Sequence, residues 1–174
     1  MSGNFLIEDL QVRDLPSVLA IQSEVYPEYL VESSEVFLSR LSLKNSCCFA
    51  AREGERLFGY IIAYGWQADD PPPLGTVAAI EKQSDVLFIH DLAVSGSGRG
   101  GGIGKQLVER AFDFARDDGF TIAQLVAVKG AAPYWRGLGF AEAQVAGKLR
   151  AKVLGYGTDA RWMTRVIPAS DVVC

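Results

Sequence analysis

The order of apolar and polar residues along the chain predicts strands that alternate with helices. Apolar runs of strand length occupy residues 5–12, 47–52, 57–66, 86–94, 122–128 and 161–167, and a further strand starts at Gly139-Phe140. Recurrence of apolar residues every three or four positions indicates amphipathic helices over residues 14–25, 34–43, 102–118 and 131–138. This alternation is typical of an α/β domain with a mixed sheet.

Turn-forming residues separate these segments. Residues 53–56 (Glu-Gly-Glu-Arg) join two strand-like runs and predict a hairpin. Residues 67–85 form a long connection that contains three consecutive prolines. Connections longer than roughly 12–15 residues in compact domains are usually functional or disordered. We find no internal repeat and no low-complexity tract, so residues 1–174 are predicted to form one domain.

Composition and charge narrow the partners that the chain is expected to bind. Hydrophobic residues make up 49% of the 174 residues, which is enough for one core. The formal net charge of −4 gives no basic field for nucleic acid, and no apolar run is long enough for a membrane span. The three cysteines and the single histidine have no metal-binding spacing, and the N-terminus lacks a signal-peptide pattern. We expect a cytoplasmic monomer or homodimer without nucleic acid, membrane or metal partners.

A glycine-rich segment from Val94 to Lys105 is the most informative part of the sequence. It follows a predicted strand and leads into a predicted amphipathic helix. Glycines let the backbone approach a ligand, and the N-terminus of a helix attracts anions through free N–H groups and the helix dipole. Arg99 and Lys105 add two positive charges. The segment therefore predicts a site for a diphosphate on an otherwise acidic protein.

Two other phosphate-loop patterns fit this segment less well. A Walker A loop would need glycine at Arg99 and a hydroxyl residue at Gln106. The dinucleotide pattern G-x-G-x-x-G fits residues 96–101, but no acidic residue ends a second strand about 20 residues later. A glycine-rich turn that binds no ligand remains a further alternative.

A third pattern, R-x-x-G-x-G, is formed by Arg99, Gly102 and Gly104. It resembles the acyl-CoA pyrophosphate loop of the GNAT superfamily of N-acetyltransferases. Residues 87–94 resemble the central strand of that superfamily, and residues 133–140 resemble a later helix with its Gly-Phe. The resemblance covers roughly residues 5–144. Within the superfamily, His90-Asp91-Leu92-Ala93-Val94 and Tyr26-Pro27 look like the arylalkylamine N-acetyltransferases and their bacterial relatives.

The resemblance implies a fold, a co-substrate and a reaction. The fold would be a single α/β domain with a mixed, mostly antiparallel sheet flanked by helices, whose splayed central strands hold CoA. Acetyl-CoA would be the co-substrate, without a metal, and the primary amine of a small molecule would attack the thioester directly in a ternary complex. The residues implied in CoA binding are Leu92, Ala93, Val94, Arg99, Gly100, Gly101, Gly102, Ile103, Gly104, Lys105 and Trp135.

Two proton transfers need side chains. Removing the proton of a primary alkylamine with a pKa of about 10.4 costs roughly 4.6 kcal/mol at pH 7. A base with a pKa near 7 therefore helps this proton transfer. His90 coincides with one of two histidines of the arylalkylamine enzymes, and Phe88 replaces the other. We expect Asp91 on the alternate face of the strand, where it would stabilise the strand or a loop. A satisfied structural histidine is the alternative for His90.

The acid that protonates the leaving thiolate is open at this point. Many superfamily members carry a tyrosine where this chain has Trp135, and Tyr134 precedes it. Adjacent residues on an ideal helix point about 100° apart, so Tyr134 does not simply substitute for the missing tyrosine. Tyr134 is a candidate for the catalytic acid. The alternatives are a core aromatic at this position and protonation of the thiolate through water.

The acceptor is expected to contact the long connection at residues 67–85 together with aromatic and acidic residues, predicted as Tyr26, Glu28, Tyr29 and Trp66. They would hold a cationic aralkylamine, whereas Glu24, Glu32 and Asp69-Asp70 equally permit a polyamine. Two other functions remain open. One is acetylation of a protein N-terminus or lysine, which needs an open groove, and the other is non-catalytic binding of acyl-CoA.

Overall fold

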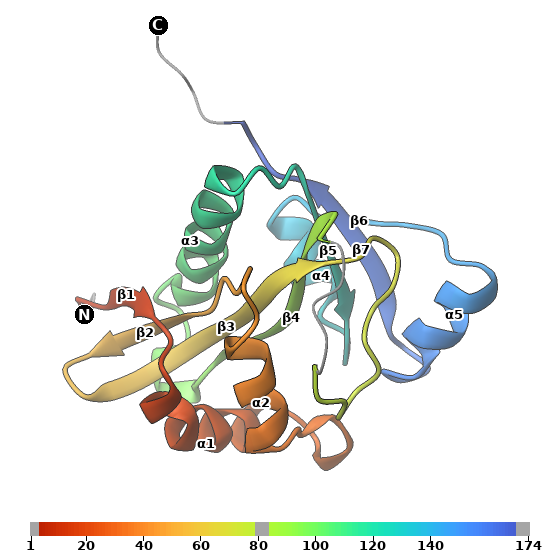
Figure 1. Ribbon diagram of the computed structural model, residues 1–174. Coiled ribbons are helices and arrows are strands. Elements are labelled where there is room, and N and C mark those ends of the chain that lie inside the picture. Colours follow the sequence, from red (N-terminus) through yellow and green to blue (C-terminus); the bar gives the residue numbers. More distant parts are fainter. Residues whose placement is uncertain (1–3, 79–83, 170–174) are drawn as a thin grey trace, which may run out of the picture.

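The computed structural model describes residues 4–78 and 84–169 (Figure 1). In these residues a seven-stranded sheet has the order β1-β2-β3-β4-β5-β7-β6, and β4 and β5 are its parallel pair. The strands are β1 (Leu6–Asp9), β2 (Phe49–Glu53), β3 (Arg56–Trp66), β4 (Val86–Val94), β5 (Ile122–Ala127), β6 (Ala141–Glu142) and β7 (Arg161–Val166). The predicted α/β fold with a mixed, mostly antiparallel sheet is confirmed.

Helices cover both faces of this sheet (Figure 1). One core cluster packs α3 and α4 against the sheet, and a second cluster packs α1, α2 and α5 against the opposite face. The helices are α1 (Leu15–Val25), α2 (Ser34–Leu41), α3 (Ile103–Asp117), α4 (Ala132–Gly137) and α5 (Gly147–Leu154), with short 3-10 turns at Val12–Asp14, Glu28–Leu30 and Gly96–Gly98. The sequence pattern did not predict α5, which has no clear apolar stripe and buries only Val153.

The central strands β4 and β5 separate along their length. In the described strands their pairing is confined to Leu87–Ile89 of β4 and Ala123–Leu125 of β5. On its other side, β4 stays paired with β3 as far as Val94, opposite Gly59. Beyond Ile89, the end of β4 is therefore paired with a strand on its β3 side only, and its edge toward β5 has no strand partner among the described residues. This is the predicted splay of the central strands.

A β-bulge lies in β4 just where the splay begins. Ile62 of β3 pairs with Asp91, and the next residue of β3 pairs with Ile89, so His90 is the extra residue. Both His90 and Asp91 therefore face the α1 side of the sheet. The strict alternation of an unbroken strand, which predicts Asp91 on the opposite face, does not hold here.

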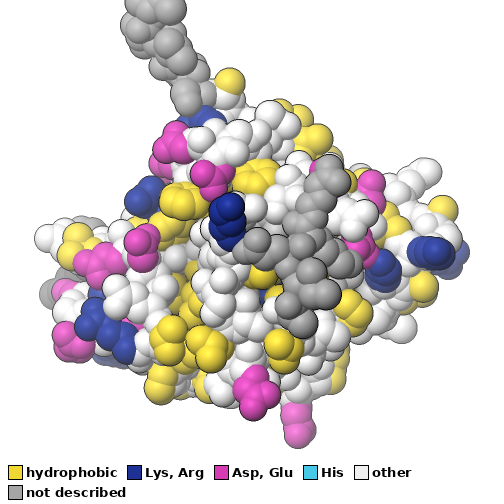
Figure 2. Space-filling view, viewed as in Figure 1, with side chains coloured by type: hydrophobic (Ala, Val, Ile, Leu, Met, Phe, Trp, Pro, Cys, Tyr) yellow, Lys and Arg dark blue, Asp and Glu magenta, His cyan; other side chains and the backbone are white. Residues whose placement is uncertain are grey.

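The surface does not concentrate charge of one sign in the view of Figure 2, where Lys and Arg side chains are scattered among Asp and Glu side chains. Within residues 4–78 and 84–169, no helix is long and apolar enough to cross a bilayer.

Candidate functional site

Two cavities meet at the C-terminal end of β4. The larger, of about 490 Å³, is here called the loop cleft and lies over the start of α3. The smaller, of about 130 Å³, is called the inner cavity and lies between β4, β5 and the segment that follows α1. Both are lined by Leu92, Ala131 and Tyr134, so a ligand group in one cavity contacts the same residues as a group in the other.

The loop cleft has the geometry of an anion site. Gly102 precedes α3 with a φ of 72°, a left-handed conformation that favours glycine, and no side chain caps the helix. The first hydrogen bond within the helix runs from Gln106 N to Gly102 O over 3.1 Å. The N–H groups of Ile103, Gly104 and Lys105 precede that bond and are free to bind a ligand. They lie at the positive end of the helix dipole.

Two cations line the same cleft. Arg99 and Lys105 are both exposed, and Lys105 Nζ lies 3.9 Å from Glu109 Oε1, a loose pair between two exposed side chains. Such surface pairs contribute little, so Lys105 can also contact an anion. Backbone donors, two cations and glycines without side chains together fit a diphosphate of the kind found in coenzyme A.

Most of the residues predicted to hold CoA line the loop cleft, and two do not. Gly101 lies against Phe5 instead. Trp135 is 7% exposed, packs edge-on against Phe140 and lines the inner cavity. The predicted residues that line the loop cleft are Leu92, Ala93, Val94, Arg99, Gly100, Gly102, Ile103, Gly104 and Lys105.

Tyr134 lies where the two cavities meet. Its hydroxyl lies so close to Gly104 that a side chain at that glycine would overlap it. Burial raises the pKa of Tyr134 above its ordinary value, so the hydroxyl keeps its proton at neutral pH. The neighbouring Trp135 has no hydroxyl and packs in the core. Of these two aromatic residues, Tyr134 is therefore the one that can provide a proton at the cavity junction.

The inner cavity combines acidic, aromatic and apolar side chains. Its polar residues are Glu32, His90 and Asp91, with Tyr26 and Tyr156 from segments that cover the sheet. The apolar part of the lining is formed by Leu30, Leu74, Ile89, Leu125, Val126 and Val128. Two carboxylates in a small, largely apolar space attract a cation.

Two buried side chains, Glu32 and His90, are hydrogen-bonded at the wall of this cavity. Glu32 Oε1 lies 2.5 Å from His90 Nε2, and the two side chains are 5% and 2% exposed. Glu32 Oε2 accepts a hydrogen bond from Gly75 N over 2.8 Å. Burial raises the pKa of Glu32, but the charge and hydrogen bond of His90, the Gly75 hydrogen bond and the charge of Arg40 together hold it below its usual value.

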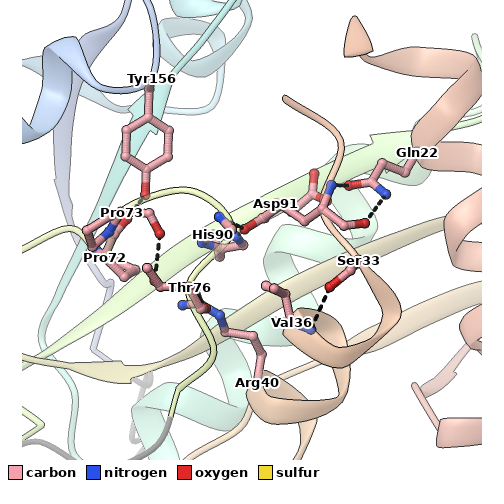
Figure 3. Close-up of polar contacts among 12 residues, drawn as sticks. Gln22, Ser33, Val36, Arg40, Pro72, Pro73, Thr76, His90, Asp91 and Tyr156 are labelled. Carbon is pink, nitrogen blue, oxygen red and sulfur yellow. Dashed lines mark hydrogen bonds and ion pairs between the residues drawn. The ribbon is translucent and has the colours of Figure 1, made fainter. Parts of the chain in front are cut away.

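The backbone of Glu32 is held as firmly as its side chain. Gln22 of α1 accepts from Glu32 N over 2.7 Å and donates to Glu32 O over 2.9 Å, and Figure 3 draws both hydrogen bonds of Gln22 as dashed lines. Gln22 is buried. Its two hydrogen bonds with the backbone of Glu32 explain why a polar residue lies on the apolar side of α1. Sequence reasoning treated Glu32 only as one of several acidic residues.

Asp91 has its own hydrogen-bond partners. Its carboxylate accepts from Tyr60 Oη over 2.7 Å. The hydroxyl of Tyr26, which donates to Leu92 O over 2.8 Å, lies close enough to influence the same carboxylate. Burial raises the pKa of Asp91 to about 6, although the hydrogen bond from Tyr60 and the nearby Tyr26 hydroxyl lower it. Asp91 therefore exchanges a proton near neutral pH.

The segment from Asp69 to Thr76 covers the inner cavity. Tyr156, just after α5, donates to Pro72 O (Figure 3), and Lys152 of α5 pairs with Asp70. Leu74 of this segment lines the cavity. The long connection was predicted to take part in acceptor binding, and its described part lies at the site; residues 79–83 lie outside the described residues.

Of the four residues predicted to contact the acceptor, Tyr26 lines the inner cavity. Glu28 and Tyr29 line neither cavity, and Tyr29 is 61% exposed. Trp66 is buried and pairs with Val86 at the start of β4, at the opposite end of the strand. Among the described side chains, no group of three or more His, Cys, Asp or Glu residues is arranged to hold a metal ion.

Comparisons with known proteins agree with this geometry. The profile described as Acetyltransferase (GNAT) family matches residues 11–140. No curated protein matches the chain. Solved structures share its fold. The ribosomal-protein-S18-alanine N-acetyltransferase from Escherichia coli is 19% identical, with a TM-score of 0.65 and 98% of each chain covered.

Two further structures show the same fold with CoA or a CoA analogue. The PaiA N-acetyltransferase from Thermoplasma acidophilum, in complex with coenzyme A, is 14% identical, with a TM-score of 0.69, over 94% of this chain and 99% of that one. Naa50 from Arabidopsis thaliana, in complex with the bisubstrate analogue CoA-Ac-MVNAL, is 13% identical, with a TM-score of 0.66, over 94% and 99% of the chains.

Proposed function

Because the chain belongs to the GNAT family of acetyltransferases, we propose that it moves the acetyl group of acetyl-CoA to the primary amine of a compact small molecule. The observation that carries this proposal is the inner cavity. It is small, it contains Glu32 and Asp91, and it meets the loop cleft at Leu92, Ala131 and Tyr134. An amine held by the carboxylates would lie beside the end of β4.

The loop cleft is where CoA would be held. The first-turn N–H groups of α3, with Arg99 and Lys105, would bind its diphosphate, and the backbone of residues 92–94 would contact its arm. When bound, acetyl-CoA supplies a thioester as the acetyl donor. Backbone N–H groups at the strand end would stabilise the charge that develops on the acetyl oxygen, and one such donor is typically worth about 10²–10³ in rate.

The protein must take a proton from the acceptor and provide one to the departing sulphur. The Tyr134 hydroxyl lies at the junction of the cavities and keeps its proton at neutral pH, which supports its assignment as the acid. His90, the base suggested by the sequence, lines the inner cavity from the bulge of β4.

The size of the inner cavity favours a compact acceptor. Pockets for drug-sized ligands usually occupy about 300–1,000 Å³, which exceeds the roughly 130 Å³ found here. Leu74 and Tyr156 line this cavity from the segment after β3 and from the end of α5. The aromatic lining suits an aralkylamine, whereas the second carboxylate suits the second ammonium group of a polyamine.

A panel assay tests the proposal. Release of the free thiol from acetyl-CoA is measured with aralkylamines, polyamines and peptides that carry a free N-terminus. We expect turnover with one of the two classes of small amine and little with peptides. Turnover with peptides alone would contradict a small-molecule acceptor. Binding of acetyl-CoA in isothermal titration calorimetry, without turnover of any acceptor, would identify a non-catalytic binding module.

A further inference from the structure

We propose that Asp91, and not His90, is the group that accepts the proton of the acceptor amine. This inference rests on the proposed function and assigns a role within the same site. It follows from the hydrogen bonds that each of the two side chains makes at the wall of the inner cavity. Asp91 would be the catalytic base, and His90 a positioning residue bound to Glu32.

The bulge in β4 determines which way the Asp91 side chain points. Because His90 is the extra residue, the side chain of Asp91 turns to the inner cavity in place of the opposite face of the sheet. Asp91 directly precedes Leu92, which lines both cavities. Its carboxylate is thus the acidic group next to the strand end, where the acetyl group would be held.

Hydroxyl groups hold this carboxylate in place. Tyr60 is fully buried on β3 and donates to Asp91 Oδ2 over 2.7 Å. Tyr26, bonded to Leu92 O, lies on the same side. A general base must be within hydrogen-bond reach of the proton it removes, and these contacts fix Asp91 at the cavity wall.

His90 does not meet this requirement. Its side chain is 2% exposed, and Nε2 is already bound to Glu32. Its Nδ1 is buried from solvent and has no hydrogen-bond partner among the described residues. A ligand in the cavity therefore reaches neither ring nitrogen without movement of the ring, and the imidazole instead ties β4 to Glu32.

The protonation behaviour of Asp91 agrees with this assignment. Burial raises its pKa to about 6, so the carboxylate is about 90% ionised at pH 7 and is a stronger base than an exposed aspartate. The ammonium loses one proton to Asp91, which passes it to solvent. The amine nitrogen then forms the amide bond with the acetyl carbon as the bond between that carbon and the sulphur breaks. Tyr134 gives its hydroxyl proton to the sulphur, and the second proton that the nitrogen loses returns to Tyr134.

Kinetics of Asp91→Asn and His90→Gln test the assignment, with the best amine of the panel as acceptor. We expect Asp91→Asn to lower kcat by about 10²–10³ and to leave the affinity for acetyl-CoA unchanged. In the wild type, kcat should fall below an apparent pKa near 6. Asp91→Asn should lose this limb, whereas His90→Gln should keep it and lose less than tenfold in kcat.

Three results would overturn the assignment. One is a kcat of Asp91→Asn within threefold of the wild type, and another is a loss confined to the KM of the amine, which would make Asp91 an anchor for charge. The third is disappearance of the acidic limb in His90→Gln, a readout that holds even if Asp91→Asn does not fold. A wild type that acetylates no amine would instead overturn the proposed function itself.

Discussion

The Oε1 atom of Glu32 lies 2.5 Å from the Nε2 atom of His90, across 58 residues of sequence. The other oxygen of Glu32 binds the backbone of Gly75. One carboxylate therefore joins the segment after α1, the bulge of β4 and the segment that covers the inner cavity. These are three of the walls between which the acceptor would bind, so the pair fixes the shape of the cavity as well as its charge.

Removal of one partner of this pair should be costly. We expect Glu32→Ala to lower the free energy of unfolding by about 3–5 kcal/mol, because it leaves His90 buried without a partner. The free energies come from urea unfolding at pH 7. Because the folded-state pKa of Glu32 is lowered, its contribution is present above its ordinary pKa of 4.5 and is lost as the pH falls through the folded value.

A double-mutant cycle of Glu32→Ala and His90→Ala separates the interaction free energy of the pair from the effect of each residue alone. The double mutant should lose less stability than the two single mutants added together, whereas simple additivity would contradict a coupled pair. Glu28→Ala is the matched control. Glu28 is exposed and lines neither cavity, so its replacement should change stability by less than about 0.5 kcal/mol.

The start of α3 provides the test of the CoA site. Gly104→Asp should weaken CoA binding by more than about 100-fold, because it places a negative charge among the phosphate-binding N–H groups and a side chain against Tyr134. Isothermal titration calorimetry measures the affinity. The same substitution at Gly54, in the β2–β3 hairpin with open space around it, should leave the affinity unchanged. Equal affinities for both variants would remove CoA from this cleft.

The strand-to-helix segment shows how much of the site the sequence could predict. Glycines at fixed spacing and an amphipathic pattern are local features, so they predicted the loop cleft and the residues that line it. The overall fold followed for the same reason, since strands and long helices carry periodic patterns. The splay of β4 and β5 came from the family resemblance.

The inner cavity was harder to predict, because non-local contacts form it. The order of apolar and polar residues in β4 does not reveal the bulge at His90, so Asp91 was expected on the wrong face of the strand. Gln22 lies on an apolar helix side only because Glu32 binds it. Trp66 was assigned to the acceptor site from its residue type, yet it lies at the far end of β3 from the cavities.

Tyr134→Phe tests the acid. This substitution removes only the hydroxyl at the cavity junction, so we expect kcat to fall by tenfold or more while CoA affinity stays the same. Steady-state kinetics with the best amine measures the effect. Tyr29→Phe removes an equivalent hydroxyl from an exposed residue outside both cavities and should have no effect. Full activity of Tyr134→Phe would indicate that water protonates the thiolate.

Asp91 should also leave a signature in stability. Folding raises its pKa from 3.8 to about 6, so the folded state holds the proton more tightly than the unfolded state. The contribution of Asp91 to the free energy of unfolding should therefore fall as the pH rises from about 4 to about 6, by at most about 3 kcal/mol, and then level off. Asp91→Asn removes this dependence.

Thermal unfolding at two pH values measures this effect. The unfolding temperature of Asp91→Asn minus that of the wild type should be higher at pH 8 than at pH 4.5. Asp159→Asn, at an exposed carboxylate, should show no such change. An Asp91→Asn difference that is the same at both pH values would mean that burial does not raise the pKa of this carboxyl group.

The most direct test of the account is a competition for the acetyl group in one reaction. Acetyl-CoA and the protein are mixed with equal concentrations of small amines and of peptides with free N-termini, and mass spectrometry identifies the acetylated products. We predict that acetyl groups accumulate on a small amine. Acetylation of the peptides alone, or of nothing in the mixture, would contradict the account.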